Sequence, residues 1–289
     1  MAIKFTKLHS AGNDFVLVEA AGLNMDWSEL ARAMCHRRFG VGGDGLLLLL
    51  PSQQADFTMR IFNADGSEAE ACGNGLRCLV HYIFTRGLAK DTNMVTVATA
   101  AGMRKARLFT EGRELVRIES SMGAPQLKAE AIPVAAEQGR GEIDLEMGFI
   151  SSYPLVVKGR KLALSFVSMG NPHAVHFTRK QVASFPLERI GPLVEEDKLF
   201  PKRVNFEVAN VINDKLIEVR VWERGVGETL ACGSGGCAVA VAARLLGYVG
   251  DEVDIKLPGG TLRVRWDGQG EVYLSGRAEV VFTGDWPHN

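Results

Sequence analysis

Positive charge is not in excess in this 289-residue sequence, because 33 Lys and Arg side chains are matched by 34 Asp and Glu. The composition therefore favours neither nucleic acid nor an anionic membrane surface as a partner. The longest apolar runs, at residues 46–50 and 237–243, fall far short of the roughly 18 residues that a membrane-spanning helix needs. The first residues also lack the apolar core of a signal peptide, so the expected location is the cytoplasm.

Cysteine is scarce and odd in number, with five residues: Cys35, Cys72, Cys78, Cys232 and Cys237. An odd count does not suit the paired disulfides of a small secreted protein, so we expect free thiols. A zinc site is disfavoured because the two close pairs lie within expected helices, where their side chains would diverge. We therefore expect no bound metal.

Cofactor motifs are missing as well. Gly40-Val-Gly-Gly-Asp-Gly is glycine-rich, but it has neither the Gly-Lys-Ser/Thr ending of a P-loop nor the spacing of a dinucleotide-binding loop. We interpret it as a tight turn before the apolar strand at residues 46–50. No lysine is marked as a pyridoxal-phosphate ligand, so we expect no cofactor.

The sequence does contain one five-residue motif twice. Ala71-Cys-Gly-Asn-Gly returns 160 residues later as Ala231-Cys-Gly-Ser-Gly, and each copy ends a polar turn and opens an apolar helical run. We therefore expect Cys72 and Cys232 at helix N-termini, where unpaired backbone N–H groups and the helix dipole favour an anion or a thiolate. A thiol so placed can have its pKa lowered from about 8.5 to roughly 3.5–7.5.

A second repeated pair supports a duplication. Gly-Asn at Asn13 and again at Asn171 precedes the two cysteines by 59 and 61 residues. Equal order and similar spacing predict two copies of one fold, related by a pseudo-two-fold axis. Because strand-like segments dominate and helices are few, we expect a mixed α/β (α+β) fold with its junction near residues 123–140.

Polar residues around these motifs suggest a binding site for an amino acid. The candidates are Asn13, Asn63, Asn171, Asn205, Glu223 and Arg224. Arginine and amides suit a carboxylate and glutamate suits an ammonium group, so together they fit a zwitterion. Two thiols facing one such substrate could act as the acid and base of a cofactor-free racemase or epimerase. A redox dithiol is the alternative, although it needs no such set of anchoring residues.

These motifs resemble the diaminopimelate epimerase family nearly end to end. The resemblance rests on Gly12-Asn-Asp-Phe, Phe39-Gly-Val-Gly-Gly-Asp-Gly, Phe62-Asn-Ala-Asp-Gly-Ser, Ala71-Cys-Gly-Asn-Gly-Leu-Arg-Cys, Gly170-Asn-Pro-His, Val204-Asn-Phe and the most specific run, residues 223–235. It implies two pseudo-symmetric domains, each a curled, mostly antiparallel sheet or barrel around a central helix. The expected halves are residues 1–130 with 276–289, carrying Cys72, and residues 131–275, carrying Cys232.

The resemblance also implies the activity and the roles of individual residues. The activity is the cofactor-independent interconversion of LL- and meso-diaminopimelate, in lysine and peptidoglycan precursor biosynthesis, by a chain that is a homodimer by family analogy. Cys72 and Cys232 would be the acid/base pair. The implied substrate contacts are Gly73, Asn74, Gly233 and Ser234 at the α-carboxylate, Asn63, Asn171, Asn205 and Arg224 at the distal end, and Asn13 and Glu223 near the reacting amino group.

Two positions stay open within that resemblance. Some family members have glutamine where this chain has Gly45, which removes one substrate contact, and His173 is either a tuning residue for a cysteine or a simple turn residue. Alternative functions are a proline- or hydroxyproline-type racemase or epimerase, or a non-catalytic redox dithiol or amino-acid-binding protein. The residues available for a distal carboxylate favour the longer substrate.

Overall fold

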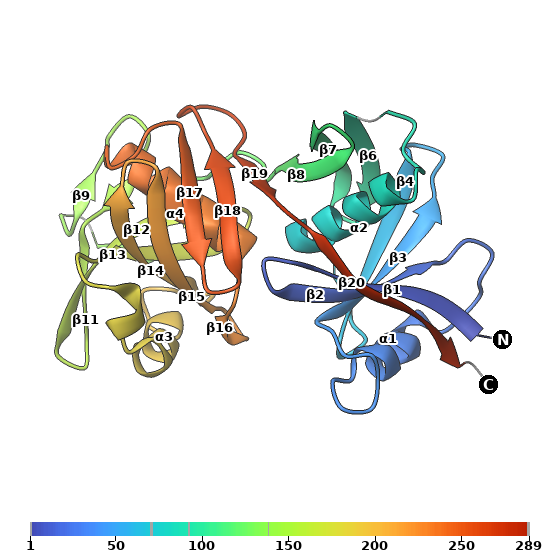
Figure 1. Cartoon of the computed structure of the whole chain (residues 1–289). Helices are drawn as coiled ribbons and strands as arrows, with labels where there is room; N and C mark the ends of the chain where they lie inside the picture. Colours follow the sequence, from blue (N-terminus) through green and yellow to red (C-terminus); the bar gives the residue numbers. More distant parts are fainter. Residues whose placement is uncertain (1, 70–71, 92, 138, 288–289) are drawn as a thin grey trace. The chain divides into compact units, whose positions relative to one another are not determined.

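The computed structural model describes residues 2–69, 72–91, 93–137 and 139–287. Ala71 of the first cysteine motif and Thr92 lie outside the described residues. The chain divides into two compact units, Met1–Ser121 with Ser275–Asn289, and Met122–Leu274 (Figure 1). Each unit is built mainly of strands with a central helix.

The first unit is a mostly antiparallel sheet in the order β20-β1-β2-β3-β4-β6-β7-β8. Its elements are β1 (Ala2–Ser10), β2 (Asn13–Glu19), α1 (Trp27–Cys35), β3 (Gly45–Pro51), β4 (Phe57–Asn63), β5 (Glu68–Ala69), α2 (Gly73–Thr85), β6 (Met94–Thr99), β7 (Gly102–Glu111), β8 (Glu114–Ser121) and β20 (Glu279–Pro287). The pairs β2–β3 and β4–β6 are parallel, and α1 and α2 provide those two crossovers.

The second unit repeats this plan. Its elements are β9 (Glu142–Ile143), β10 (Ile150–Ser151), β11 (Tyr153–Val157), β12 (Arg160–Ser168), β13 (Pro172–Phe177), η1 (Val182–Ser184), α3 (Leu187–Glu195), β14 (Asn205–Asn213), β15 (Leu216–Glu223), β16 (Gly227–Thr229), α4 (Gly233–Leu245), β17 (Glu252–Leu257) and β18 (Gly260–Arg265). β19 (Tyr273–Gly276) follows, and the boundary between the two units falls within this strand, after Leu274.

The two units share one sequence of strand directions. From β12 to β18 the pairings alternate antiparallel, parallel, antiparallel, parallel and antiparallel, as they do from β1 to β7. The helices α3 and α4 supply the parallel crossovers in the places of α1 and α2. The duplication predicted from the repeated motifs is therefore confirmed in the topology.

Both faces of the first sheet are apolar, which explains the leucine run at residues 46–50. Leu47 and Leu49 of β3 pack with the helix α2 in one hydrophobic cluster, whereas Leu46 and Leu48 pack with α1 in another. A strand covered on both faces reads as a continuous apolar run, because alternate side chains enter different cores.

The central helices carry the deepest part of each core. On α2, Leu79, Val80 and Ile83 are fully buried, and strands β1, β2, β3, β4, β8 and β20 all contact the helix. On α4 the side chains from 237 to 243 are buried, as the nearly uniform apolar character of that segment predicted. Cys78 and Cys237 lie in these cores, so they are packing residues.

The helix α3 tests how tightly the second unit is packed. A Cβ at Gly191 would lie 2.5 Å from the ring of Trp222, whose indole N–H donates to Glu195 at 2.8 Å. We expect Gly191→Ala to lower the free energy of unfolding by about 1–3 kcal/mol, because the ring must move from its packed position. Chemical denaturation would measure this difference.

Gly236→Ala is the matched control, since that glycine is also helical but its Cβ would meet Ile255 at an ordinary 3.5 Å. It should be neutral or stabilising by up to about 1 kcal/mol. An equal free energy of unfolding in the two variants would contradict the tight packing of Gly191 against Trp222.

Candidate active site

Both repeated cysteines cap central helices, as predicted. Cys72 is the N-cap of α2 and Cys232 is the N-cap of α4, each with extended backbone angles. The Sγ atoms accept hydrogen bonds from the N–H groups of Gly75 at 3.3 Å and Gly235 at 3.4 Å. Each thiol therefore faces the backbone N–H groups at the start of its helix, the position that favours negative charge.

Glycine stands at the third helical position in both copies, where a side chain would be crowded. A Cβ on Gly75 would lie 3.0 Å from Leu47, and a Cβ on Gly235 would lie 2.9 Å from the Glu207 carboxylate and 3.3 Å from the Cys232 sulfur. The missing side chain lets each helix start close to its sheet. This close packing accounts for the second glycine of Gly-Asn-Gly and of Gly-Ser-Gly.

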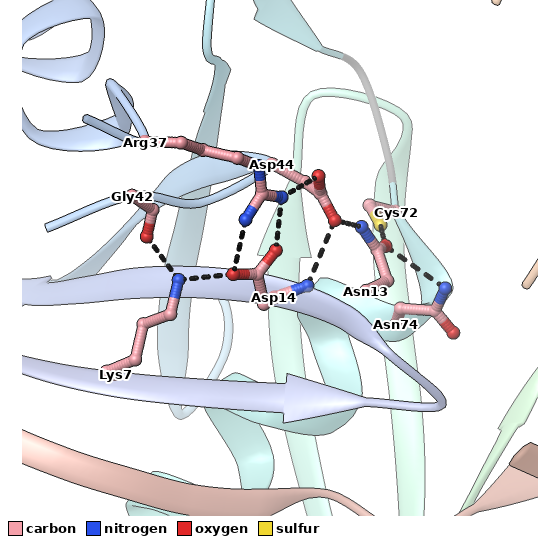
Figure 2. Close-up of polar contacts among 8 residues, drawn as sticks. All are labelled: Lys7, Asn13, Asp14, Arg37, Gly42, Asp44, Cys72 and Asn74. Atoms are coloured by element: carbon pink, nitrogen blue, oxygen red, sulfur yellow. Dashed lines mark hydrogen bonds and ion pairs between the residues drawn. The ribbon is translucent and has the colours of Figure 1, made fainter. Parts of the chain in front are cut away.

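In the first unit, the structure brings Asn13 to Cys72. The Oδ1 atom of Asn13 accepts from the Cys72 thiol at 3.8 Å and from Nδ2 of Asn74 at 3.1 Å (Figure 2). The Asn74 side chain is buried, and its own Oδ1 accepts from Arg77. Asn74 is thus a partner of Asn13 through its side chain, in addition to the backbone N–H that the sequence suggested.

Beside these residues lies a charged cluster that sequence reasoning missed (Figure 2). Asp44 accepts from Nδ2 of Asn13 at 2.6 Å and pairs with Arg37 at 2.7 Å. Arg37 also pairs with Asp14 at 2.7 Å, and Lys7 pairs with Asp14 at 2.5 Å. The aspartates of Gly-Asn-Asp and Gly-Gly-Asp were visible as motif residues, but their meeting depends on the parallel pairing of β2 and β3.

Asn63 and Gly45 lie at the same end of this sheet. Asn63 ends β4 opposite Gly45 of β3, is exposed, and donates from Nδ2 to Ser67 Oγ at 2.9 Å. A Cβ on Gly45 would lie 2.8 Å from the Phe62 carbonyl oxygen. The close pairing of β3 and β4 therefore gives this glycine a packing role in the present chain.

In the second unit, four side chains form a hydrogen-bonded series that ends at Cys232. Ser234 Oγ lies 3.5 Å from the Cys232 sulfur and accepts from Nδ2 of Asn171 at 3.4 Å. The Oδ1 atom of Asn171 lies 2.9 Å from Nε2 of His173. The predicted residues Asn171, Ser234 and Cys232 are therefore neighbours, and His173 joins them.

His173 is not a turn residue, so that alternative was wrong. It lies fully buried on β13, and its Nδ1 is 2.6 Å from the carboxylate of Glu207, which is also fully buried. Burial raises the pKa of Glu207, although the charge and hydrogen bond of His173 act in the opposite direction. Sequence reasoning missed Glu207; the signal was an acidic residue inside the apolar strand Val204-Asn-Phe-Glu-Val.

The expectation of a lowered thiol pKa fails for Cys232. Burial raises the pKa of this thiol well above its usual range, and the negative charges of Glu223 and Glu207 raise it further. The hydrogen bonds from Ser234 and the Gly235 N–H favour the thiolate but do not offset this loss of solvation. The surroundings of Cys232 therefore favour the neutral thiol, the form that can donate a proton.

The remaining predicted residues lie at the ends of β14 and β15. Asn205 is buried, donates to the Pro172 carbonyl at 2.9 Å and accepts from the Arg224 backbone N–H at 2.9 Å. Glu223 accepts from Thr229 Oγ1 at 2.5 Å, and the exposed Arg224 guanidinium donates to the Lys202 carbonyl at 3.0 Å. Asn205 thus fixes the backbone that carries Arg224.

Over the described part of the chain, no three His, Cys, Asp or Glu side chains are grouped so that they could hold a metal ion. Within the same residues, every helix is too short or too polar to cross a membrane.

Solved structures of low sequence identity define the fold. A phenazine biosynthesis protein of the PhzF family from Bacillus anthracis matches with a TM-score of 0.71 at 18% identity, covering all of both chains. A hydroxyproline epimerase from Agrobacterium vitis matches with a TM-score of 0.66 at 15% identity, over 99% of this chain and 92% of that one. The chain therefore has the fold of PhzF proteins and proline racemase-like epimerases, and the mixed α+β prediction is confirmed.

Sequence relatives identify the family within that fold. The family model described as diaminopimelate epimerase matches residues 5–128 and 165–281. Diaminopimelate epimerases of Moorella thermoacetica and Desulfovibrio desulfuricans are each 46% identical, over 98% and 99% of this chain and 99% of each relative. The chain belongs to the diaminopimelate epimerase family.

The buried His173–Glu207 pair gives a stability prediction. His173→Leu should lower the free energy of unfolding by about 3–5 kcal/mol, because the Glu207 carboxyl stays buried without its partner. Arg60→Ala, which breaks the partly exposed ion pair with Glu68 at 2.7 Å, should cost only about 0–1 kcal/mol. Denaturant titrations of both variants measure the free energy of unfolding. Equal losses of stability in the two variants would contradict a dominant role for burial.

Asp14 gives a pH prediction. Burial raises the pKa of its carboxyl, but hydrogen bonds from Arg37 and Lys7 outweigh burial and lower the value from 3.8 to about 2. Because the folded pKa is below the unfolded one, this stabilisation is present above pH 3.8 and is lost as the pH falls toward 2. Between pH 6 and pH 2 the chain should lose about 2 kcal/mol more stability than Asp14→Asn. The free energy of unfolding of both chains can be measured by chemical denaturation at the two pH values. Equal losses in the unchanged chain and in Asp14→Asn would contradict the prediction.

Proposed function

We propose that this chain interconverts LL- and meso-diaminopimelate without a cofactor, with Cys72 and Cys232 as the two proton-transfer groups. Membership of the diaminopimelate epimerase family supports the reaction. The single observation that carries the residue assignment is the repeated geometry in which a cysteine caps the central helix of each unit. The substrate is accordingly a small amino acid.

The chemical difficulty is the removal of a weakly acidic α-proton without an electron sink. In the proposed reaction one cysteine, as thiolate, takes the proton from one face of the α-carbon. The electron pair left on carbon takes a proton from the thiol of the other cysteine on the opposite face, and the configuration inverts. The two sulfurs have then exchanged protonation states, so the same pair serves the reverse reaction.

The helix N-termini supply the stabilisation that a cofactor would otherwise provide. Negative charge that develops at the α-carbon spreads into the carboxylate, and oriented N–H groups stabilise it most where water is excluded. We assign this role to the backbone N–H groups of Gly73, Asn74, Gly233 and Ser234. Their position in the first turn of α2 and α4 supports the assignment.

The remaining polar residues are assigned to the two ends of the substrate. Asn13 and Glu223 present acceptor oxygens suited to the reacting ammonium group, and Asn63, Asn171, Asn205 and Arg224 are assigned to the distal amino-acid end. For Asn205 the contacts support an indirect role, because its amide holds the Arg224 backbone. His173 is assigned to the support of Asn171, which it contacts at 2.9 Å.

The proposal extends to the organisation of the chain. Each compact unit is one half of the epimerase, one carrying Cys72 and the other Cys232, and the repeated order of strands supports this division. A cytoplasmic location and a homodimer belong to the proposal by analogy with the family. The proline- or hydroxyproline-type and redox alternatives are not favoured by the sequence relatives.

The reaction can be tested by proton NMR of LL-diaminopimelate with the reduced chain in deuterium oxide. We expect loss of one α-proton signal and growth of the meso isomer, because the donor thiol carries deuterium. Exchange with proline or hydroxyproline in place of diaminopimelate would assign the chain to the other activity. No exchange with any of them would contradict the proposal.

Cysteine variants test the two-base assignment. Cys72→Ala and Cys232→Ala should each reduce epimerisation by at least about a thousandfold, since each removes one proton-transfer group. Cys237→Ala is the matched control on the same helix as Cys232, and it should keep most of the activity because Cys237 lies in the core. Full activity in either of the first two variants would overturn the scheme.

A further inference from the structure

The side-chain amides of Asn13 and Asn74, next to Cys72, lie between one group that can only donate hydrogen bonds and one that can only accept them. At one end the buried Arg77 guanidinium, which only donates, bonds to Oδ1 of Asn74. At the other end the Asp44 carboxylate, which only accepts, takes Nδ2 of Asn13 at 2.6 Å (Figure 2). Both amides therefore have a defined orientation.

The hydrogen bond between the two amides has the direction that Arg77 and Asp44 require. Nδ2 of Asn74 donates to Oδ1 of Asn13 at 3.1 Å, so donors and acceptors run in one direction from Arg77 to Asp44. A reversed Asn13 amide would place its oxygen against the Asp44 carboxylate and its NH₂ against that of Asn74. Both contacts would be repulsive, so Oδ1 must face Cys72.

This orientation decides what Cys72 can do. The Gly75 N–H at 3.3 Å from the sulfur favours the thiolate of Cys72, whereas the amide oxygen of Asn13 at 3.8 Å accepts only from the neutral thiol and would oppose the thiolate with a lone pair. A hydrogen bond made only by the neutral form favours that form. The same oxygen is also a suitable acceptor for an ammonium group.

Asp44 is itself held in place. Its Oδ1 pairs with Arg37 at 2.7 Å, and its Oδ2, the atom that binds Asn13, also accepts the backbone N–H of Asp14 at 3.1 Å. Arg37 is in turn fixed by Asp14 at 2.7 Å. The carboxylate is therefore a rigid anchor for Asn13 although its side chain is about 42% exposed.

We propose that Asp44 is a positioning residue, which holds Oδ1 of Asn13 toward the Cys72 thiol and thereby favours the neutral form of that thiol over the thiolate. The effect on Cys72 stands on the contacts of the first unit alone. Its consequence for catalysis rests on the proposed epimerase function, in which Asn13 also receives the substrate ammonium group.

The test is Asp44→Asn in the full chain, since asparagine can donate as well as accept and no longer dictates the orientation of Asn13. We expect iodoacetamide to alkylate Cys72 at pH 7 about three- to tenfold faster than in the unchanged chain, the range for one lost hydrogen bond. Mass spectrometry of the peptide assigns the site. We also expect kcat/KM for diaminopimelate to fall by a similar factor.

Asp14→Asn is the control for charge, because it removes one negative charge from the same cluster without touching Asn13. A greater rate in Asp44→Asn than in Asp14→Asn supports orientation, whereas equal rates would mean that charge alone acts and would overturn the proposal. An unchanged rate in Asp44→Asn would overturn it as well. Thermal melting of both variants confirms that they are folded before the comparison.

The two readouts separate this inference from the proposed function. Alkylation needs no substrate, so a faster reaction at Cys72 in a chain that does not epimerise diaminopimelate would refute only the function. An epimerase whose Cys72 reactivity is unaffected by Asp44→Asn would refute only the role of Asp44.

Discussion

The start of each central helix is the constraint on which both half-sites depend. The first N–H groups of a helix have no partner within it, and in α2 and α4 one of them is satisfied by the sulfur of the capping cysteine. The glycines at 75 and 235 allow this approach, since a side chain at these positions would crowd Leu47 of the sheet or the Glu207 carboxylate. Capping, helix placement and the location of the reactive atom are therefore one feature.

The two half-sites share this geometry but differ in their surroundings. Cys72 faces the amide oxygen of Asn13, beside a partly exposed cluster of two acids and two bases. Cys232 is buried, and two carboxylates together with loss of solvation raise its pKa. The duplicated fold thus holds two thiols in different electrostatic environments. The capping geometry at the helix start is the same in both units, but the residues around it differ.

Much of the site could be read from motifs because its residues are close in sequence or repeated. The two cysteines, the glycines after them and the Gly-Asn pairs were identified from their spacing, and the buried character of α4 followed from its uniform composition. For Gly45, by contrast, the sequence indicated only the loss of a substrate contact. Its packing role became clear from the neighbouring strand, whose Phe62 carbonyl lies 2.8 Å from where a Cβ would be. His173 was ambiguous because a residue after Asn-Pro can turn or enter a strand.

The duplication, the two helix-capping thiols and the family are all legible in the amino-acid sequence, since they depend on local composition and on repeats along the chain. Which polar residues meet depends instead on strand pairing between distant segments. Asp44 reaches Asn13 through the parallel pairing of β2 and β3, and Glu207 reaches His173 through that of β13 and β14. The raised pKa of Cys232 also depends on the tertiary structure, because its burial and the carboxylates near it come from long-range packing that no local pattern records.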